Sequence, residues 1–536
     1  MKFIKHFDQF FKEKSLRGDV NRDIRRMAKI VAKQAPKPDT NKIVVSFNAS
    51  TRISGLSLNA AYAMLTGWSL RLQGVNVVNF VCQRGMTRCV LGTDQLDVRK
   101  IPPCQECLKQ SKAIYTKSKI RRMDYFPSSD LAKSLQNLEL ARLRHFRYDG
   151  IPLGDLCLPS MRWILRRHHL NDDHDTQILY SHYILSAYKV AMEFERLLLE
   201  MNPTSVLVFN GMQFPEGTAR WMARKFGTPV YSHEVGLLPF SGFFTEGEAT
   251  AYSVDISEDF QLSDKQNKEL DEYLSHRFKG DFSMAGVQFW PEMTGLDEDF
   301  IQKIDSFQQI VPIFTNVIFD TSQPHANVIF SHMFAWLDKV LRVIKSHPET
   351  LFVIRAHPDE SRPGKISQEN VADWVSSKGV DQLPNVISVG PDVHFSSYEM
   401  IQRAKFVMIY NSTIGMEASI MGAPVLCAGK ARFTQLDTVY FPKSQRDYMA
   451  QLEKFLDADT VPVLKEHQIN SRRFLFYQLY RTSLSFNRYI EPDDIWPGFV
   501  RLKAFSWQDL LPENSVTMQV ISEGLLNGKP FILPNE

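Results

Sequence analysis

The sequence lacks the features that would place the chain in a membrane or among small secreted proteins. It holds only six cysteines in 536 residues, which is not the disulfide framework of a secreted scaffold. No apolar run reaches the roughly 18 residues that a membrane-spanning helix needs. The N-terminus shows no apolar h-region, so we expect no signal peptide. These absences predict a cytoplasmic protein.

The charge is nearly balanced, with 63 Lys and Arg against 60 Asp and Glu and a formal net charge of +3. It is unevenly spread, because residues 1–34 hold ten basic and four acidic side chains, which leaves −3 for the other 502 residues. A body without a basic excess argues against nucleic acid as a partner.

The basic segment reads as an amphipathic helix. "MKFIKHFDQFFKEKSLRG" places Phe3, Ile4, Phe7, Phe10 and Phe11 at helical spacing, with lysines between them. Such a helix either packs on the body of the protein or makes a peripheral contact with a membrane through residues 1–18. The second alternative would put the protein at the inner face of the membrane.

The rest of the chain alternates between apolar strands and amphipathic helices. Residues 42–48, 58–72 and 75–81 read as strand, helix and strand, and the order repeats over 205–236. It restarts at 309–320 and continues to the strand at 424–429. This alternation predicts an α/β fold with two Rossmann-like, doubly wound domains and a cleft between them.

We expect four parts along the chain. They are a basic helical extension at 1–34, an N-terminal acceptor-side domain at 42–300, a C-terminal nucleotide-donor domain at 306–470, and a tail at 471–536 that packs back on the body.

Polar residues follow the predicted strands. Ligands of open α/β sheets bind at the carboxyl ends of strands, so these residues are site candidates. On the acceptor side they are Asn210, Gly211, His233 and Glu234, and on the donor side Thr315, Asn316, Arg355, His357, Pro358, Asn411, Ser412 and Thr413.

The stretch "YNSTIGMEASIMGAPV" reads as a strand, a hydroxyl-rich turn and a helix. Ser412 and Thr413 would bind a phosphate at the helix start, or merely cap the helix. Glu417, one turn later, suits a pair of ribose hydroxyls.

"VIRAHPDESR" would face this turn, with Arg355 and a protonated His357 stabilising a departing phosphate. Glu234 or His233 would deprotonate the acceptor hydroxyl. The other His-Pro pair, at His347, lies between a helix and a strand and is interpreted as a turn.

These motifs, in this order, resemble the GT-B glycosyltransferases of bacterial capsule and surface-polysaccharide biosynthesis. The resemblance covers most of residues 42–430 and rests on "FTNVIFDT", "RAHPDESR", "YNSTIGMEASIMGAPV", "VFNGMQFPEG" and "YSHEVG". It implies a nucleotide-sugar donor (a CMP-sugar or another nucleotide-sugar) and a glycan or lipid-linked acceptor. It also implies that His357 and Pro358 contact the nucleotide and leaving phosphate, Ser412 and Thr413 the phosphate, and Glu417 the ribose.

Several alternatives stay open. Related transferases of CMP-sugars have Ser-Ser or Ser-Thr at the place of Ser412-Thr413. Because this chain does not have the Ser-Ser pair, the motif does not establish a CMP-sugar donor. Polyol-phosphate transferases use comparable motifs, so a CDP-polyol donor remains an alternative. A nucleotide-sugar epimerase of the same fold is another. The non-enzymatic alternative is a nucleotide-sugar-binding subunit without catalysis.

Four cysteines form a separate cluster. Cys82, Cys89, Cys104 and Cys107 have the spacing C-x6-C-x14-C-x2-C. Four thiolates can hold zinc in a tetrahedral site, which we predict as a structural metal. An iron–sulfur cluster and unligated thiols or a disulfide are the alternatives.

Overall fold

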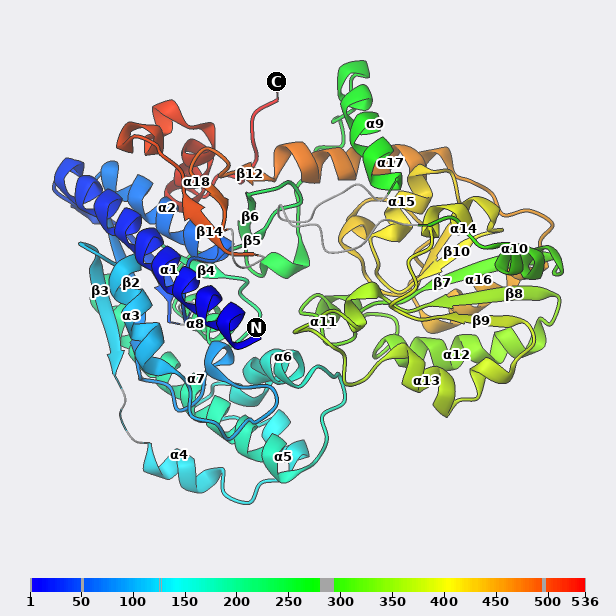
Figure 1. Cartoon of the computed structure of the whole chain (residues 1–536), viewed down its shortest axis with the longest axis horizontal. Helices are drawn as coiled ribbons and strands as arrows, with labels where there is room; N and C mark the ends of the chain where they lie inside the picture. Colours follow the sequence, from blue (N-terminus) through cyan, green and yellow to red (C-terminus); the bar gives the residue numbers. More distant parts are fainter. Residues whose placement is uncertain are drawn as a thin grey trace.

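The structure is a computed structural model. It describes residues 2–49, 53–124, 126, 128–279, 294–493 and 498–535, except for the side chains of residues 2–15. The described chain forms two α/β halves that lie side by side (Figure 1).

The N-terminal half is built on a seven-stranded sheet in the order β12-β6-β5-β4-β1-β2-β3. The strands β3, β2, β1, β4 and β5 are parallel, while β6 and β12 join antiparallel at one edge. Their bounds are β1 Asp39–Asn48, β2 Val75–Gln83, β3 Lys119–Asp124, β4 Ser205–Phe209, β5 Val230–Val235, β6 Ser241–Glu246 and β12 Leu484–Ser485.

Helices cover both faces of this sheet, so its strands are apolar on both sides. On one face of the sheet, Val45 and Val78 belong to a core that also contains residues of α6 and α7. On the other face, Val44 and Val77 belong to a core that also contains residues of α1, α2 and α18. The helices of this half are α1 Lys2–Gln34, α2 Leu58–Leu72, α3 Cys104–Ile114, α4 Ser129–Ser134, α5 Leu140–Arg144, α6 Leu153–Leu165, α7 His174–Met201, α8 Glu216–Lys225 and α18 Val516–Asn527.

The C-terminal half holds a five-stranded, fully parallel sheet in the order β11-β10-β7-β8-β9. Its strands are β7 Gln309–Phe314, β8 Thr350–Arg355, β9 Val386–Val389, β10 Val407–Ile409 and β11 Val425–Cys427. Val311 and Phe352 face one core, and Ile310 and Leu351 the other.

The helices of this half are α9 Asp264–Phe278, α10 Glu298–Asp305, α11 Gln323–Ala326, α12 Met333–Ser346, α13 Val371–Ser377, α14 Ser397–Arg403, α15 Ile414–Ile420, α16 Gln445–Asp457 and α17 Lys465–Phe476. Parallel strands joined by helices in both halves confirm the predicted fold class of two Rossmann-like domains.

Over its described residues, the chain crosses from the first half to the second and back again. It leaves the first sheet after β6 and continues to α9, which packs in a core of the second half through Leu270 and Leu274. It returns after α17, at the top of Figure 1, to reach β12 at the edge of the first sheet. Beyond β12 lie a small hairpin (β13 Ile490–Pro492 and β14 Val500–Leu502) and then α18.

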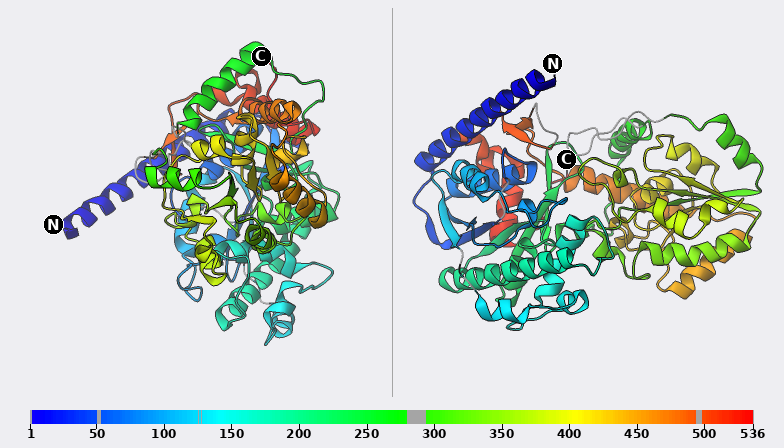
Figure 2. Two further views of the ribbon diagram at one scale, coloured as in Figure 1. Left: turned by 90° about the vertical axis from the view of Figure 1, so that its right-hand side faces the viewer. Right: turned by 60° about the horizontal axis from the view of Figure 1, so that its bottom comes forward.

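Helix α1 divides into a packed part and a projecting part. Val20, Ile24, Ala28 and Val31 recur every three or four residues and are buried against the first half. The N-terminal part projects away from the body (Figure 2). The phenylalanines that suggested a membrane contact lie outside the described side chains. Within the described residues, no helix combines the length and apolarity that a membrane crossing requires.

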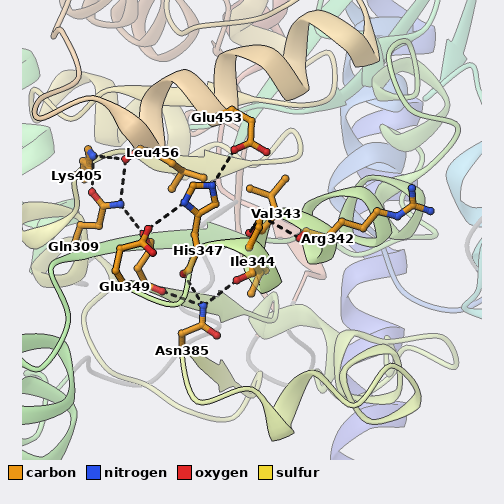
Figure 3. A network of polar contacts seen from close by, with 12 residues as sticks. Gln309, Arg342, Val343, Ile344, His347, Glu349, Asn385, Lys405, Glu453 and Leu456 are labelled. Carbon is orange, nitrogen blue, oxygen red and sulfur yellow. Dashed lines mark hydrogen bonds and ion pairs between the residues drawn. The ribbon is translucent and has the colours of Figure 1, made fainter.

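His347, the other His-Pro histidine, belongs to a polar network at the end of β8 away from His357 (Figure 3). Its Nδ1 lies 3.1 Å from Glu349 and its Nε2 lies 2.9 Å from Glu453. Asn385 donates to the backbone carbonyl of His347 at 2.9 Å. Burial alone would lower the pKa of His347, but the hydrogen bonds to Glu453 and Glu349 outweigh it and raise the pKa above 6.5. His347 therefore lies in a turn, as the sequence indicated, and it also connects this turn to α16 through Glu453, which the sequence did not indicate.

We predict that His347 stabilises the fold in a pH-dependent way. Because its pKa is raised on folding, its contribution should be complete below pH 6.5 and should disappear as the pH rises through the raised value. His347→Gln should therefore lower the free energy of unfolding by up to about 1 kcal/mol near pH 6 and by less near pH 9. Urea unfolding at the two pH values measures this, and an equal loss at both would contradict it.

Candidate active site

A cavity of about 840 Å³ lies between the two halves and is lined by both. All but one of the predicted acceptor-side and donor-side residues border it. From the first half they are Asn210, His233 and Glu234, and from the second Thr315, Asn316, Arg355, His357, Pro358, Asn411, Ser412, Thr413 and Glu417. The exception is Gly211, whose carbonyl accepts a hydrogen bond from Arg220 Nε at 2.8 Å, in a turn where Gly211 has a φ of +79°.

His357 opens a short helical turn at Pro358–Glu360, directly after β8. Its Nδ1 accepts a hydrogen bond from the backbone N–H of Asp359 at 3.1 Å, so a neutral ring carries its proton on Nε2. Burial lowers the pKa of His357, although the carboxylates of Asp359 and Asp320 oppose this effect. The imidazole is therefore neutral at pH 7, in contrast to the protonated form expected from the sequence, and offers an Nε2–H donor.

Three donor-side residues join the ends of neighbouring strands. Thr315 donates through Oγ1 to the carbonyl of Arg355 at 2.8 Å, which joins β7 to β8. Asn316 accepts from the backbone N–H of Asn411 at 3.2 Å, which joins β7 to β10. The side chain of Asn411 in turn accepts from Gln323 at 3.1 Å. These bonds fix the turns that carry His357 and Ser412 relative to each other.

The hydroxyl-rich turn precedes α15. Thr413 occupies the N-cap position, yet its side chain makes no capping hydrogen bond, and its backbone is already helical with φ −62° and ψ −22°. Backbone bonds close the turn instead, from Gly415 N–H to the Ser412 carbonyl at 3.1 Å and from Met416 N–H to the Thr413 carbonyl at 3.1 Å. The capping role considered for Thr413 is thus not used, and the turn borders the cavity.

Glu417 is 2% exposed and is held by two side chains that the sequence did not identify. Arg277, from α9, approaches its Oε1 with Nε and Nη2, each at 2.6 Å. Tyr398, from α14, donates to its Oε2 at 2.6 Å. Glu417 thus attaches α9 to the second sheet, and a ribose contact through it stays a prediction.

Glu234 ends β5 and faces the cavity from the first half. Its carboxylate accepts hydrogen bonds from Asn210 at 2.9 Å, the Val235 backbone at 3.0 Å and Asn59 at 3.2 Å. Burial raises the pKa of Glu234, these hydrogen bonds oppose the rise, and the nearby carboxylate of Asp320 adds to it. A carboxylate with a raised pKa, held by neutral donors, is suited to accept a proton.

His233 is less suited to this role. It is 2% exposed, and its ring centroid lies 5.4 Å from that of Phe244 and 5.9 Å from that of Phe209. Burial lowers its pKa to about 3. Of the two base candidates, the geometry favours Glu234.

Arg355 is largely buried beside the cavity. Its guanidinium lies 4.8 Å from the centroid of Phe395 and donates to the carbonyl of Val393 at 3.1 Å. Burial lowers the pKa of Arg355 to about 10, so it remains a cation at neutral pH. Arg362 lies 3.6 Å from Asp359, with which it forms a salt bridge within this turn.

Further charged residues of the cavity were missed in the sequence. Asp320 lies close enough to both His357 and Glu234 to influence their pKa values. Lys365, Lys430 and Arg432 add positive charge to the wall. Lys430 and Arg432 follow β11 within five residues, so the rule that strand ends carry site residues could have found them.

The metal site predicted at Cys82, Cys89, Cys104 and Cys107 is not supported. Cys82 ends β2, Cys89 precedes a short turn, and Cys104 and Cys107 begin α3, and none of them is in a disulfide. Burial raises the pKa of Cys82 to about 11 and that of Cys89 to about 12, with smaller contributions from the neighbouring thiols. These contributions from Cys104 and Cys107 show that the thiols lie near one another. Among the described residues, no group of three or more His, Cys, Asp or Glu could hold a metal ion.

Distant similarities to solved structures extend over both halves. KpsC of Thermosulfurimonas dismutans, a β-Kdo 2,4-transferase, is 10% identical over 52% of this chain and 80% of its own, with a TM-score of 0.35. The UDP-GlcNAc 2-epimerase of Neisseria meningitidis is 14% identical over 82% and 99%, with a TM-score of 0.23. Sucrose-phosphate synthase of Thermosynechococcus elongatus is 10% identical over 81% and 94%, with a TM-score of 0.26.

No curated protein sequence matches the chain. A family model does match, over residues 274–473, and it describes the capsule polysaccharide biosynthesis proteins. The matched segment runs from the end of α9 to α17 and includes both the His357 turn and the Ser412 turn. Residues 274–473 are therefore similar to the capsule polysaccharide biosynthesis proteins, the family that the sequence motifs resemble.

Proposed function

We propose that this protein is a glycosyltransferase that moves a sugar from a nucleotide-sugar to a polysaccharide or glycolipid acceptor in the cleft. The observation that carries the proposal is a single cavity with a proton-accepting carboxylate, Glu234, on one wall and the His357 and Ser412 turns on the other. Its volume of about 840 Å³ suits a ligand of nucleotide-sugar size. The name of the matched family supports a role in capsule polysaccharide synthesis.

On the acceptor wall, Glu234 takes the proton of the attacking hydroxyl. Asn59 and Asn210 hold its two oxygens from different elements, so the carboxylate keeps one orientation. A base fixed in this way lowers the barrier by removing the proton as the new bond forms.

On the donor wall, fixed hydrogen-bond donors stabilise the negative charge that develops on the leaving phosphate. We assign this role to His357 Nε2–H and to the hydroxyls of Ser412 and Thr413, with Arg355 and Lys365 supplying positive charge. Preorganised donors and cations stabilise a departing oxyanion because they need no reorganisation during the reaction. These side chains can do so without a metal ion.

In the transfer, the acceptor oxygen bonds to the anomeric carbon and its proton passes to Glu234. The bond between the anomeric carbon and the phosphate oxygen breaks, and the nucleotide leaves with the electron pair. Glu234, across the cavity from Ser412, also weighs against the alternative of a non-catalytic binding subunit, because such a subunit would not need a base.

The projecting part of α1 supports a location at the inner face of a membrane, where a lipid-linked acceptor would reside. Its Lys-rich sequence and its projection from the body fit a peripheral contact (Figure 2).

Removal of the His357 imidazole should impair transfer and leave the fold intact. We expect His357→Ala to lower kcat by about 10²–10³, the usual cost of removing one preorganised donor to a developing oxyanion. His347→Ala is the matched control, because it removes the other His-Pro histidine outside the cavity. Release of nucleotide from CMP-, CDP-, UDP- and GDP-sugars measures the rate, and equal rates for both variants would contradict the assignment.

Glu234→Gln should abolish proton acceptance while keeping the shape of the side chain. We expect kcat to fall by about 10²–10⁴ with little change in nucleotide affinity. Because the base must be ionised, the wild-type rate should rise with pH through a midpoint above 4.5, the ordinary Glu value. Glu246→Gln, at the exposed end of β6, is the control. A midpoint at or below 4.5, or an active Glu234→Gln variant, would exclude Glu234 as the base.

Deletion of residues 1–15 should weaken membrane binding alone. We expect the full chain to sediment with anionic liposomes at low salt and to be released as ionic strength rises. The shortened chain should remain soluble and bind nucleotide with unchanged affinity, since it keeps Val20, Ile24, Ala28 and Val31, which pack against the first half. Equal sedimentation of the two chains would refute the contact.

A further inference from the structure

The end of α6 contacts the loop that follows the His357 turn, across the boundary between the halves. Arg166 ends α6 in a left-handed conformation, with φ 55°, and the chain then runs through His168 and His169 to α7. The contacted loop spans residues 361–370, between the His357 turn and α13. Residues about 200 positions apart in the sequence therefore meet here.

Hydrogen bonds form one part of the contact. The backbone N–H of Gln368 donates to the Arg166 carbonyl at 2.9 Å, and Arg166 Nη2 donates to the Gly364 carbonyl at 2.8 Å. Glu369 Oε2 accepts from the backbone N–H groups of His168 and His169 at 2.8 and 2.9 Å. Glu369 Oε1 lies 2.6 Å from His169 Nδ1.

Rings surround these hydrogen bonds. His332, which begins α12, has its ring centroid 5.0 Å from that of His168 and 4.5 Å from that of His169. The Arg166 guanidinium lies 4.6 Å from the centroid of Trp163 and 5.1 Å from that of Phe319, so it fills the space between the two halves.

The contacted loop is rigidly joined to the His357 turn. Glu360, the last residue of that turn, accepts through its carbonyl from Ser367 N–H at 2.8 Å and through Oε2 from Val371 N–H at 3.3 Å. Lys365 N–H donates to the Arg362 carbonyl at 2.8 Å. Any displacement of Glu369 is therefore transmitted to the turn that holds His357.

We propose that the Arg166–His169 segment is a latch between the two halves, and that Glu369, Arg166 and His169 are positioning residues that hold the His357 turn opposite Glu234. The latch is polar and partly exposed, with 23% of the Glu369 side chain and 57% of the His169 side chain accessible, so it can open and close as substrates pass. The phosphate contacts lie within the second half alone, whereas catalysis needs both halves. Loss of the latch should thus affect kcat more than nucleotide affinity.

The first test does not depend on the proposed function. Hydrogen–deuterium exchange of the full chain should show faster exchange at the amides of His168, His169 and Gln368 in Glu369→Ala than in the wild type. We expect a factor of roughly 10 to 100, because charge-assisted acceptors are lost. Glu453→Ala is the matched control, since it also removes a carboxylate bound to a histidine, but within one half. Unchanged exchange at these amides would overturn the latch.

The second test links the latch to His357 and rests on the proposed function. Glu369→Ala should lower kcat about 10- to 100-fold, because even a small misplacement of the reacting groups slows the reaction. The Kd of CMP, CDP, UDP or GDP, measured by calorimetry, should change by less than about threefold. Glu369→Gln, which keeps one acceptor oxygen, should recover part of the kcat that Glu369→Ala loses. His169→Ala should lower kcat less than Glu369→Ala does.

Faster exchange with an unchanged kcat in Glu369→Ala would overturn the positioning role. A wild-type protein that turns over no nucleotide-sugar would refute the proposed function instead, and the exchange experiment would still decide the latch.

Discussion

Parallel strands of one sheet all end at the same edge, and the candidate active site depends on this constraint. Asn210 and Glu234 lie at the ends of β4 and β5, and Thr315, His357 and Asn411 follow β7, β8 and β10 within two residues. Since the two sheets turn these edges toward one cavity, side chains from five strands meet without any strand being distorted. The buried strands supply the rigidity, and the turns after them supply the chemistry.

Neighbouring charges then give similar side chains different roles. Glu234 and Glu417 both border the cavity, but Glu417 is bound by a guanidinium and a phenol, whereas amides hold Glu234. Of the two, Glu234 is well placed to receive a proton, because the side chains and the amide that donate to it are neutral. Among the histidines, His347 sits between two carboxylates and has a raised pKa, while burial lowers the pKa of His357.

The sequence predicted the fold and most of the cavity because both follow from local patterns. Apolar strands alternating with helices defined the two sheets, and polar residues at strand ends located His357, Glu234 and Ser412. What it could not give depends on contacts between distant segments. Arg277 reaches Glu417 from 140 residues away, and Asn59 reaches Glu234 from 175 residues away. The cysteine spacing is not sufficient for a related reason, because whether thiols from β2 and α3 form a metal site depends on how these elements pack, and no such site is found among the described residues.

The second crossing of the chain has a consequence for biosynthesis. Leu484, Phe486 and Ile521, all made after the second sheet, belong to the core on one face of the first sheet. During translation the first sheet therefore emerges early but cannot bury that face until α18 has left the ribosome. The second half needs the chain only as far as α17, which ends at Phe476, so its core can be complete before that of the first half. The unfinished first half then exposes apolar surface for longer, which makes it the part more prone to aggregation during synthesis.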